Sequence, residues 1–301
     1  MTAPPVLFDR TLHARRLDRA APRFADFLHR RAAEDAADRL SATLRVFPLA
    51  VDLSARNGAF ARALAATPAA ARVGALIEAD LSPAMLRLRS GERTAMRVVA
   101  DEERLPFAPD SLDLVVSLLG LHWTNDLVGA LIQIRRALRP DGLFIGAFLG
   151  GATLTELRQC LLEAEDEVIG GAGPRVSPFA DGLDAGALLQ RAGFALPVAD
   201  VDRLVVRYRH PLRLMADLRA MGETNALVER PRRPLTRPVL ARAFALYQER
   251  FGLADGRVPA TFEIITATGW APHASQQVAL KPGSAKMRLA DALGVTEHKL
   301  G

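Results

Sequence analysis

Acidic residues stand at the ends of three successive apolar segments that are typical of buried strands. These residues are Asp52, Asp80 and Asp101. In an open parallel sheet, ligands bind outside the carboxyl ends of the strands, where one carboxylate can accept from a ribose diol and the next can meet an adenine amino group. The pattern indicates a nucleotide-type cofactor site. The alternative is that Asp80 and Asp101 only cap helices or begin loops.

The turn after the first strand lacks most of the glycines that such a site normally has. Ser54 and Arg56 occupy the positions where the first two glycines are expected, and Gly58 remains for close packing of the next helix on the strand. Glycine lets this turn take a positive φ and lets a ligand touch the backbone. We therefore expect Ser54 and Arg56 to crowd the loop and to weaken cofactor binding.

An imidazole and an indole follow the fourth apolar segment, at His122 and Trp123. A histidine at a pocket mouth can carry protons near neutral pH, and an indole can stack on a ring, so both are candidate catalytic residues. The alternative is that Trp123 packs under the sheet edge while Asn125 or Asp126 caps the following helix. No Ser/His/Asp order, Walker loop or metal-ligand set can be assembled, which argues against a hydrolase, a kinase or a metal site.

The segments that must position these residues alternate between strand and helix patterns from Phe47 onward. This alternation predicts an α/β fold with a mostly parallel sheet and helices on both faces. The last two strands are expected to pair with each other. The seven expected strands are residues 48–53, 73–79, 96–100, 112–118, 143–148, 201–208 and 260–268.

The domain organisation follows from the same pattern. Residues 1–45 carry apolar positions at helical spacing and predict an N-terminal helical cap. Residues 46–280 form the main domain, with a helical insertion at about 210–255 before the last strand. Residues 281–301 are a tail that is expected to be poorly tied down.

Composition limits the classes of partner. Half of the 301 residues are hydrophobic and the formal net charge is +5, but the arginines are spread along the chain without interleaved aromatics. This argues against nucleic acid, whereas an acidic protein partner or a cofactor carboxylate fits the charge. No run of about 18 apolar residues is present, so we expect no integral membrane segment and a cytoplasmic protein. The single cysteine, Cys160, excludes an intramolecular disulfide.

Two segments of the insertion and its preceding loop are candidate substrate contacts. Ser177 and Phe179 follow a glycine-rich hinge, and Glu223 and Asn225 follow a predicted helix. Both segments could close over the strand ends and form a surface for a protein substrate, or they could simply pack against each other. A carboxylate at Glu223 could receive a substrate arginine through paired N–H bonds.

Most of the first 150 residues resemble class I S-adenosylmethionine-dependent methyltransferases. The resemblance rests on the order of the strand-end acids, together with Asp101-Glu102, residues 105–107 and residues 111–117. The resemblance implies a Rossmann-like fold. Asp80 would then hold the ribose of S-adenosylmethionine and Asp101 its adenine edge. The loop with Asp52, Ser54, Arg56 and Gly58, together with Glu102 and Ser117, would complete the cofactor site. Arg56 would have to swing out, contact the methionine carboxylate or fill part of the pocket.

Further motifs resemble the complex I assembly factor 5 family between about residues 8 and 284. They include residues 8–10, 121–127, 177–179 and 221–225. The resemblance implies that the partner is the complex I subunit that holds the terminal iron–sulfur cluster, or its bacterial homologue, and that the reaction is arginine hydroxylation. Such a protein would work in the cytoplasm, at the inner face of the membrane during complex assembly.

Two other functions stay open. One is a non-catalytic assembly chaperone that has lost the cofactor. The other is a small-molecule or carrier-protein methyltransferase, since malonyl-carrier-protein methyltransferases share the front half of the chain and match the back half less well.

Overall fold

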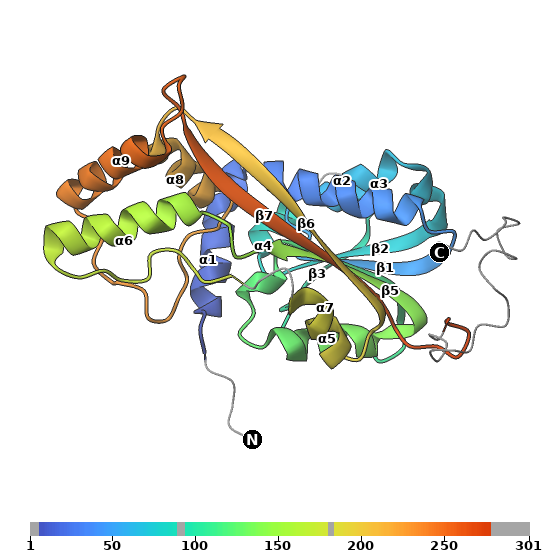
Figure 1. Ribbon diagram of the computed structural model, residues 1–301. Coiled ribbons are helices and arrows are strands. Elements are labelled where there is room, and N and C mark those ends of the chain that lie inside the picture. Colours follow the sequence, from blue (N-terminus) through green and yellow to red (C-terminus); the bar gives the residue numbers. More distant parts are fainter. Residues whose placement is uncertain (1–5, 89–93, 180–183, 278–301) are drawn as a thin grey trace, which may run out of the picture.

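The computed structural model describes residues 6–88, 94–179 and 184–277, so the predicted tail, residues 281–301, lies outside the described part. A single seven-stranded sheet forms the centre of the molecule (Figure 1). The sequence predicted all seven strands. Their bounds are β1 (Phe47–Leu53), β2 (Val73–Asp80), β3 (Thr94–Val99), β4 (Leu112–Leu118), β5 (Leu138–Leu149), β6 (Ala195–Tyr208) and β7 (Val258–Trp270).

The strand order is β3-β2-β1-β4-β5-β7-β6. The first five strands of this order are parallel, whereas β7 runs antiparallel to both β5 and β6. The predicted mostly parallel sheet and the pairing of the last two strands are therefore confirmed. The chain order reverses between β1 and β4, and the carboxyl ends of these strands form the crevice in which ligands of such sheets bind.

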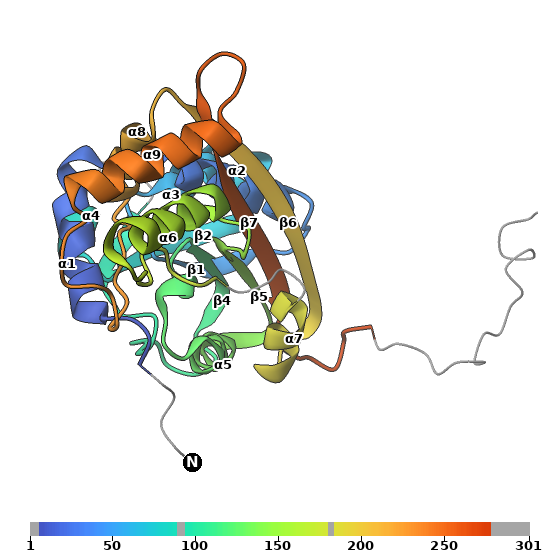
Figure 2. The ribbon, with the colours of Figure 1, turned by 60° about the vertical axis from the view of Figure 1, so that its left-hand side comes forward.

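Helices cover both faces of the sheet, as predicted (Figures 1 and 2). Two helices, α2 (Phe27–Ser41) and α3 (Ala59–Ala65), pack on one face within the larger hydrophobic core. On the opposite face, α5 (Leu127–Ala137) and α7 (Asp184–Arg191) close a second core. Both cores are made chiefly of aliphatic side chains from strands and helices, which is the layered arrangement expected of an α/β domain.

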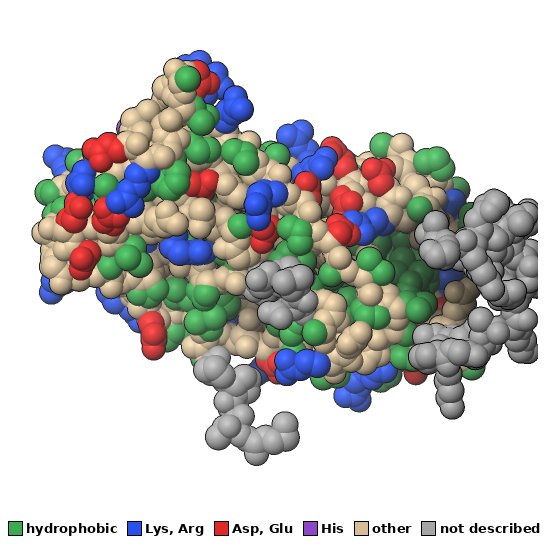
Figure 3. All heavy atoms as spheres, viewed as in Figure 1, with side chains coloured by type: hydrophobic (Ala, Val, Ile, Leu, Met, Phe, Trp, Pro, Cys, Tyr) green, Lys and Arg blue, Asp and Glu red, His purple; other side chains and the backbone are tan. Residues whose placement is uncertain are grey.

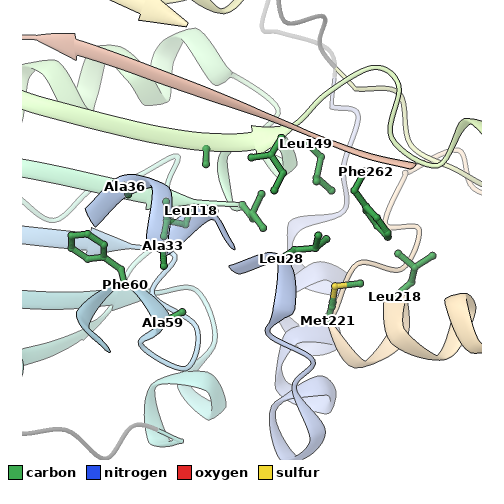
Figure 4. Packing of buried hydrophobic residues seen from close by; sticks show 14 of the residues in the cluster. Leu28, Ala33, Ala36, Ala59, Phe60, Leu118, Leu149, Leu218, Met221 and Phe262 are labelled. Atoms are coloured by element: carbon green, nitrogen blue, oxygen red, sulfur yellow. The ribbon is translucent and has the colours of Figure 1, made fainter. Parts of the chain in front are cut away.

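The sequence of α2 explains how it sits on the sheet. Leu28, Ala32, Ala36 and Leu40 recur every four residues and are all buried, so they form one apolar stripe along the helix. The small alanines let α3 approach closely, and Figure 4 shows the Phe60 ring of α3 beside this part of α2.

A group of helices extends the larger core beyond the carboxyl ends of the strands, at the left of Figure 1. The predicted N-terminal helices are α1 (Arg10–Ala20) and α2, and the predicted insertion between β6 and β7 contains α8 (Pro211–Ala220) and α9 (Arg237–Phe251). Helix α6 (Thr155–Ile169) packs along α9, and the short α4 (Pro83–Arg87) packs against α1. Figure 4 shows Leu218 and Met221, at the end of α8, near Leu28 and Phe262.

Two strands, β5 and β6, begin well before their predicted starts at residues 143 and 201. The Pro140-Asp141-Gly142 signal does end a helix, because α5 stops at Ala137, but the chain continues directly as β5 from Leu138. The signal residues lie in a register shift, with Asp141 at φ 64°, and a bulge absorbs them inside the strand. Strand β6 likewise begins at Ala195 because it follows β7 along the sheet edge past a second bulge.

Candidate functional site

The loop after β1 keeps the backbone of a glycine-rich turn although two of its three key residues are not glycine. Ser54 has φ 67°, Arg56 has φ 49° and Gly58 has φ 72°. The left-handed conformation costs a non-glycine residue roughly 1–2 kcal/mol, so the surrounding structure must stabilise Ser54 and Arg56 there.

Arg56 is stabilised by a buried ion pair with Asp80. Its Nη1 donates to Asp80 Oδ2 over 2.8 Å, and its backbone N–H donates to the same oxygen over 2.8 Å. The other Asp80 oxygen, Oδ1, accepts from the backbone N–H of Ser82 at 2.8 Å. Both ion-pair side chains have 0% solvent exposure. Of the three positions that the sequence left open for Arg56, the structure shows the one in which its side chain fills part of the expected pocket.

A second arginine, Arg10, pairs with the two carboxylates that follow β3. Arg10, from the first turn of α1, donates to Asp101 Oδ1 over 2.7 Å and pairs with Glu102 as well. Glu102 is buried and accepts a hydrogen bond from Ser54 Oγ at 2.7 Å. Two sets of contacts thus surround the loop, Arg56 with Asp80 and Ser54 with Glu102, and Arg10 joins Glu102 to Asp101. The charges of Arg56 and Glu102 couple the two sets into one electrostatic network.

Both arginines stay charged in this network. Burial alone would lower the pKa of Arg56, but the carboxylates of Asp80, Glu102 and Glu223 outweigh it, so the pKa is raised. For Arg10, burial is likewise outweighed by Glu102 and Asp101, and its pKa is raised. The site therefore holds fixed positive charge where a cofactor site would present carboxylates to a neutral ribose and adenine.

The residues present do not fit S-adenosylmethionine in the way that the resemblance implies. A ribose diol would need the carboxylate of Asp80, and that carboxylate accepts from Arg56 and from Ser82. The buried guanidinium of Arg56 also takes up space at the end of β1. Two other expected cofactor residues, Asp52 in β1 and Ser117 in β4, are buried in the sheet beneath the loop.

The candidate catalytic pair meets one of the candidate substrate residues. His122 and Trp123 lie in a short 3-10 helix, Leu121–Trp123, after β4, and Glu223 follows α8. Trp123 Nε1 donates to Glu223 Oε2 over 2.9 Å, and His122 Nε2 lies 3.2 Å from the same oxygen. The sequence proposed these residues separately, and the fold brings them together although about a hundred positions separate them.

Aromatic rings surround this cluster. The Trp123 ring stacks on His13 with centroids 4.4 Å apart and meets Phe8 edge-on at 5.2 Å. The His122 ring lies 6.0 Å from Phe179, another expected substrate residue. The alternative for Trp123 is confirmed only in that the indole is buried: it packs against Phe8, Ala226 and Leu227 and not under the sheet edge. Asp126 caps α5 by accepting from Gly129 N–H at 2.8 Å, as the alternative expected.

A cavity of about 530 Å³ opens beside the cluster, between α6, α8 and the loops that precede α7 and α9. Its size is that of a small-molecule or side-chain site. All four predicted substrate residues line it: Ser177, Phe179, Glu223 and Asn225. Asn225 also ties the two loops together, since its Nδ2 donates to the Pro174 carbonyl over 2.6 Å. The two loops therefore pack against each other and form a cavity wall at once.

The sequence predicted an N-terminal helical cap but not the side chains that α1 places at the strand ends. Arg10 and His13 both reach the strand ends from α1, and the backbone N–H of Asp9 donates to the Ala226 carbonyl beside Glu223. The Phe8-Asp9-Arg10 motif was a signal of similarity, but nothing in its spacing indicated which acids Arg10 would meet.

The described part of the chain contains neither a metal-binding cluster nor a membrane-spanning helix. Within residues 6–88, 94–179 and 184–277, no group of three or more His, Cys, Asp or Glu side chains is placed to hold a metal ion. None of the helices in that part of the chain is both long and apolar enough to cross a membrane.

The sequence is similar to a methyltransferase domain family and to several proteins of known activity. A family described as a methyltransferase domain matches residues 51–146. The arginine-hydroxylase NDUFAF5 of Danio rerio is 42% identical over 290 residues, which cover 95% of this chain and 89% of the relative. The human protein of the same name is 41% identical, with 96% and 85% coverage. A malonyl-[acyl-carrier protein] O-methyltransferase of Halorhodospira halophila is 37% identical, with 93% and 94% coverage.

A solved structure supports the fold. A Bacillus halodurans protein described as a candidate methyltransferase superposes with a TM-score of 0.55 over 80% of this chain and 99% of its own, at 16% identity. At that identity the likeness concerns the fold alone, which is the class I methyltransferase fold that the sequence predicted.

Proposed function

We propose that this protein recognises and modifies an arginine of a respiratory complex I iron–sulfur subunit, because the chain belongs to the family of the arginine-hydroxylase NDUFAF5. The modification is hydroxylation, and the partner is the subunit that holds the terminal cluster or its bacterial homologue. The protein would act in the cytoplasm, at the inner face of the membrane while the complex is assembled.

One observation at the cavity carries the proposal. Glu223 Oε2 is held by Trp123 and lies near His122, whereas Oε1 is shielded from solvent and has no hydrogen-bond partner among the described residues. A buried polar atom left without a partner costs roughly 1–3 kcal/mol. A guanidinium that enters the cavity would satisfy this oxygen with a charge-assisted hydrogen bond. Admitting it requires a small shift of the loop that carries Glu223.

The surrounding residues suit a guanidinium plane. Trp123 fixes the carboxylate, and Phe179 presents an aromatic ring to the cavity. Planar cations stack on aromatic faces, so the two groups would fix both the position and the plane of a substrate arginine. With dioxygen as the oxidant, hydroxylation that replaces a C–H bond by C–O–H also needs two protons and two electrons from an external reductant, and it releases one water. The role we assign to these residues is to hold and orient the arginine for that step.

S-adenosylmethionine has no role in this proposal. The loop network supports weak binding at best, since Arg56 occupies Asp80. The same observation favours a second candidate function, a non-catalytic chaperone that binds the arginine segment without changing it. It disfavours methyl transfer to a small molecule or carrier protein, the activity named for the Halorhodospira halophila relative.

A binding experiment with a matched control tests the role of Glu223. The terminal-cluster subunit is captured from lysate by the tagged protein and by its Glu223→Gln variant, which keeps the size of the side chain and removes its charge. Glu229→Gln is the control, because Glu229 lies on the same loop but is exposed and has no ion pair within the described residues. We expect capture to fall about tenfold for Glu223→Gln alone, as for the loss of one charge-assisted hydrogen bond. Equal capture by all three proteins would place recognition outside this carboxylate.

A further inference from the structure

The cavity beside Glu223 combines an apolar floor with an arginine-rich rim. Its floor contains leucine side chains from β5, α6 and α8, such as Leu149, Leu157 and Leu218. Among the described residues, six arginines line the cavity and Glu223 supplies its one carboxylate. The arginines are Arg16, Arg175, Arg219, Arg230, Arg232 and Arg233.

Most of this positive charge has no ion-pair partner in the part of the chain that the structure describes. Arg175 pairs with Glu165 at 2.6 Å and Arg230 lies 3.5 Å from Asp9. The other four rim arginines have no carboxylate partner among the described residues. By contrast, two arginines of α9 are paired with carboxylates of α6, Arg242 with Glu167 and Arg250 with Glu163, and Figure 3 shows both charges interspersed over these helices. Four arginines without an ion-pair partner among the described residues therefore gather around one cavity.

Like charges on the rim also repel one another. Burial lowers the pKa of Arg16, and the nearby Arg230 and Arg19 lower it further. A second hollow next to the first is lined by Arg16, Arg19, Arg219 and Thr224, so the basic surface continues outward from the cavity. Anions relieve such repulsion when they bind, and a concave surface of one sign attracts the opposite charge from solution.

We infer that the segment bound here is an acidic and apolar peptide, in which the arginine that reaches Glu223 is flanked by apolar side chains and then by aspartates or glutamates. This inference rests on the proposed function and names the chemistry of its substrate. The leucine floor accepts the apolar neighbours, and the rim arginines pair with the outer acids. An arginine set among basic residues would be repelled by the same rim, so the charge selects the sequence around the target.

Defined peptides test this inference on the full-length protein. Four probes share a leucine on either side of the central residue and differ in that residue, arginine or glutamine, and in their ends, glutamates or lysines. Calorimetry measures the affinity of each probe at about 20 mM and at about 300 mM salt, because screening weakens exposed ion pairs. We expect glutamate-ended peptides to bind at least about tenfold more tightly than lysine-ended ones at low salt and to lose much of that advantage at high salt.

Protein variants test whether the rim arginines cause the preference for glutamate-ended peptides. The combined change Arg219→Gln, Arg232→Gln and Arg233→Gln should weaken binding of the glutamate-ended arginine peptide about tenfold. Arg136→Gln, Arg191→Gln and Arg207→Gln together are the matched control, because these three arginines are exposed, unpaired among the described residues and absent from the cavity lining. The control should leave the affinity unchanged.

The outcomes separate this inference from the proposed function. Equal affinity for glutamate- and lysine-ended peptides, no measurable binding of any probe, or an unaffected rim variant would overturn the inference. Discrimination between central arginine and central glutamine that survives Glu223→Gln would instead overturn the proposed role of Glu223, while a preference for glutamate ends would still support the acidic segment.

Discussion

Restoring glycines in the loop after β1 should restore binding of the methyltransferase cofactor. The change is Ser54→Gly with Arg56→Gly, and the ligand is S-adenosylhomocysteine. In the parent protein, Asp80 Oδ2 accepts both from the Arg56 side chain and from its backbone N–H. Removing the side chain releases the carboxylate and empties the space at the end of β1, while glycine keeps the positive φ of the turn without strain.

The size of the effect follows from these contacts. A ribose diol that donates two hydrogen bonds to Asp80 gains roughly 1.5–3 kcal/mol for each, so affinity should rise by about 10²–10⁴-fold. The double substitution also lowers the free energy of unfolding, because breaking a buried ion pair costs about 3–5 kcal/mol. Relief of two left-handed residues returns roughly 1–2 kcal/mol each. We expect the variant to be less stable than the parent by no more than about 3 kcal/mol and to remain folded.

Isothermal titration calorimetry measures both proteins directly, and thermal melting confirms that each is folded. Ser54→Gly alone should give little gain, because Arg56 still holds Asp80. Adding Asp80→Asn to the double variant should remove the gain. Micromolar or tighter binding by the parent, or equal binding by the double variant, would show that Arg56 does not obstruct the site.

The same network predicts two effects on stability. Asp80→Ala should lower the free energy of unfolding by about 3–5 kcal/mol in urea denaturation, because it leaves the Arg56 charge buried without its partner; an unchanged stability would mean that the pair contributes nothing. Burial and the charge of Arg56 hold the pKa values of His13 and His29 well below 6.5, so the unfolded chain binds more protons. The stability they confer is therefore complete above pH 6.5 and is lost as the pH falls below that value, by about 1.4 kcal/mol per histidine at about pH 5.5. His29→Leu should reduce this loss between about pH 7.5 and pH 5.5; an identical pH dependence in the variant would show that His29 is not responsible.

The alternation of apolar segments was enough to predict the sheet and most of its helices. Strand and helix periods are local properties, and the rule that parallel strands end at one edge placed Asp80 and Asp101 in the same crevice. Boundaries were less well predicted where bulges absorb turn residues, as at Asp141 in β5. A stop signal for a helix does not show whether the next strand begins before or after it.

The candidate site was predicted as separate pieces, and its connections were not predicted. The sequence pattern identified Trp123 and Glu223 as candidate site residues, but their contact depends on how the insertion folds over the strand ends. The sequence showed that Arg56 stands in the place of a glycine and left its direction open. Its burial follows from Asp80, which offers a carboxylate at hydrogen-bond distance, and Arg10 joins the network from a helix far away in the sequence.

The proposed function requires that the protein modifies an arginine of the terminal iron–sulfur-cluster subunit. Mass spectrometry of that subunit, isolated from cells with the gene, without it, and complemented with Glu223→Gln, measures this modification. We predict that one arginine carries an additional oxygen atom in cells with the gene, that this oxygen is absent without it, and that the variant restores it only in part. An arginine of identical mass in all three strains would contradict enzymatic modification and leave the chaperone function, and a gained methyl group in place of oxygen would show that the protein is a methyltransferase after all.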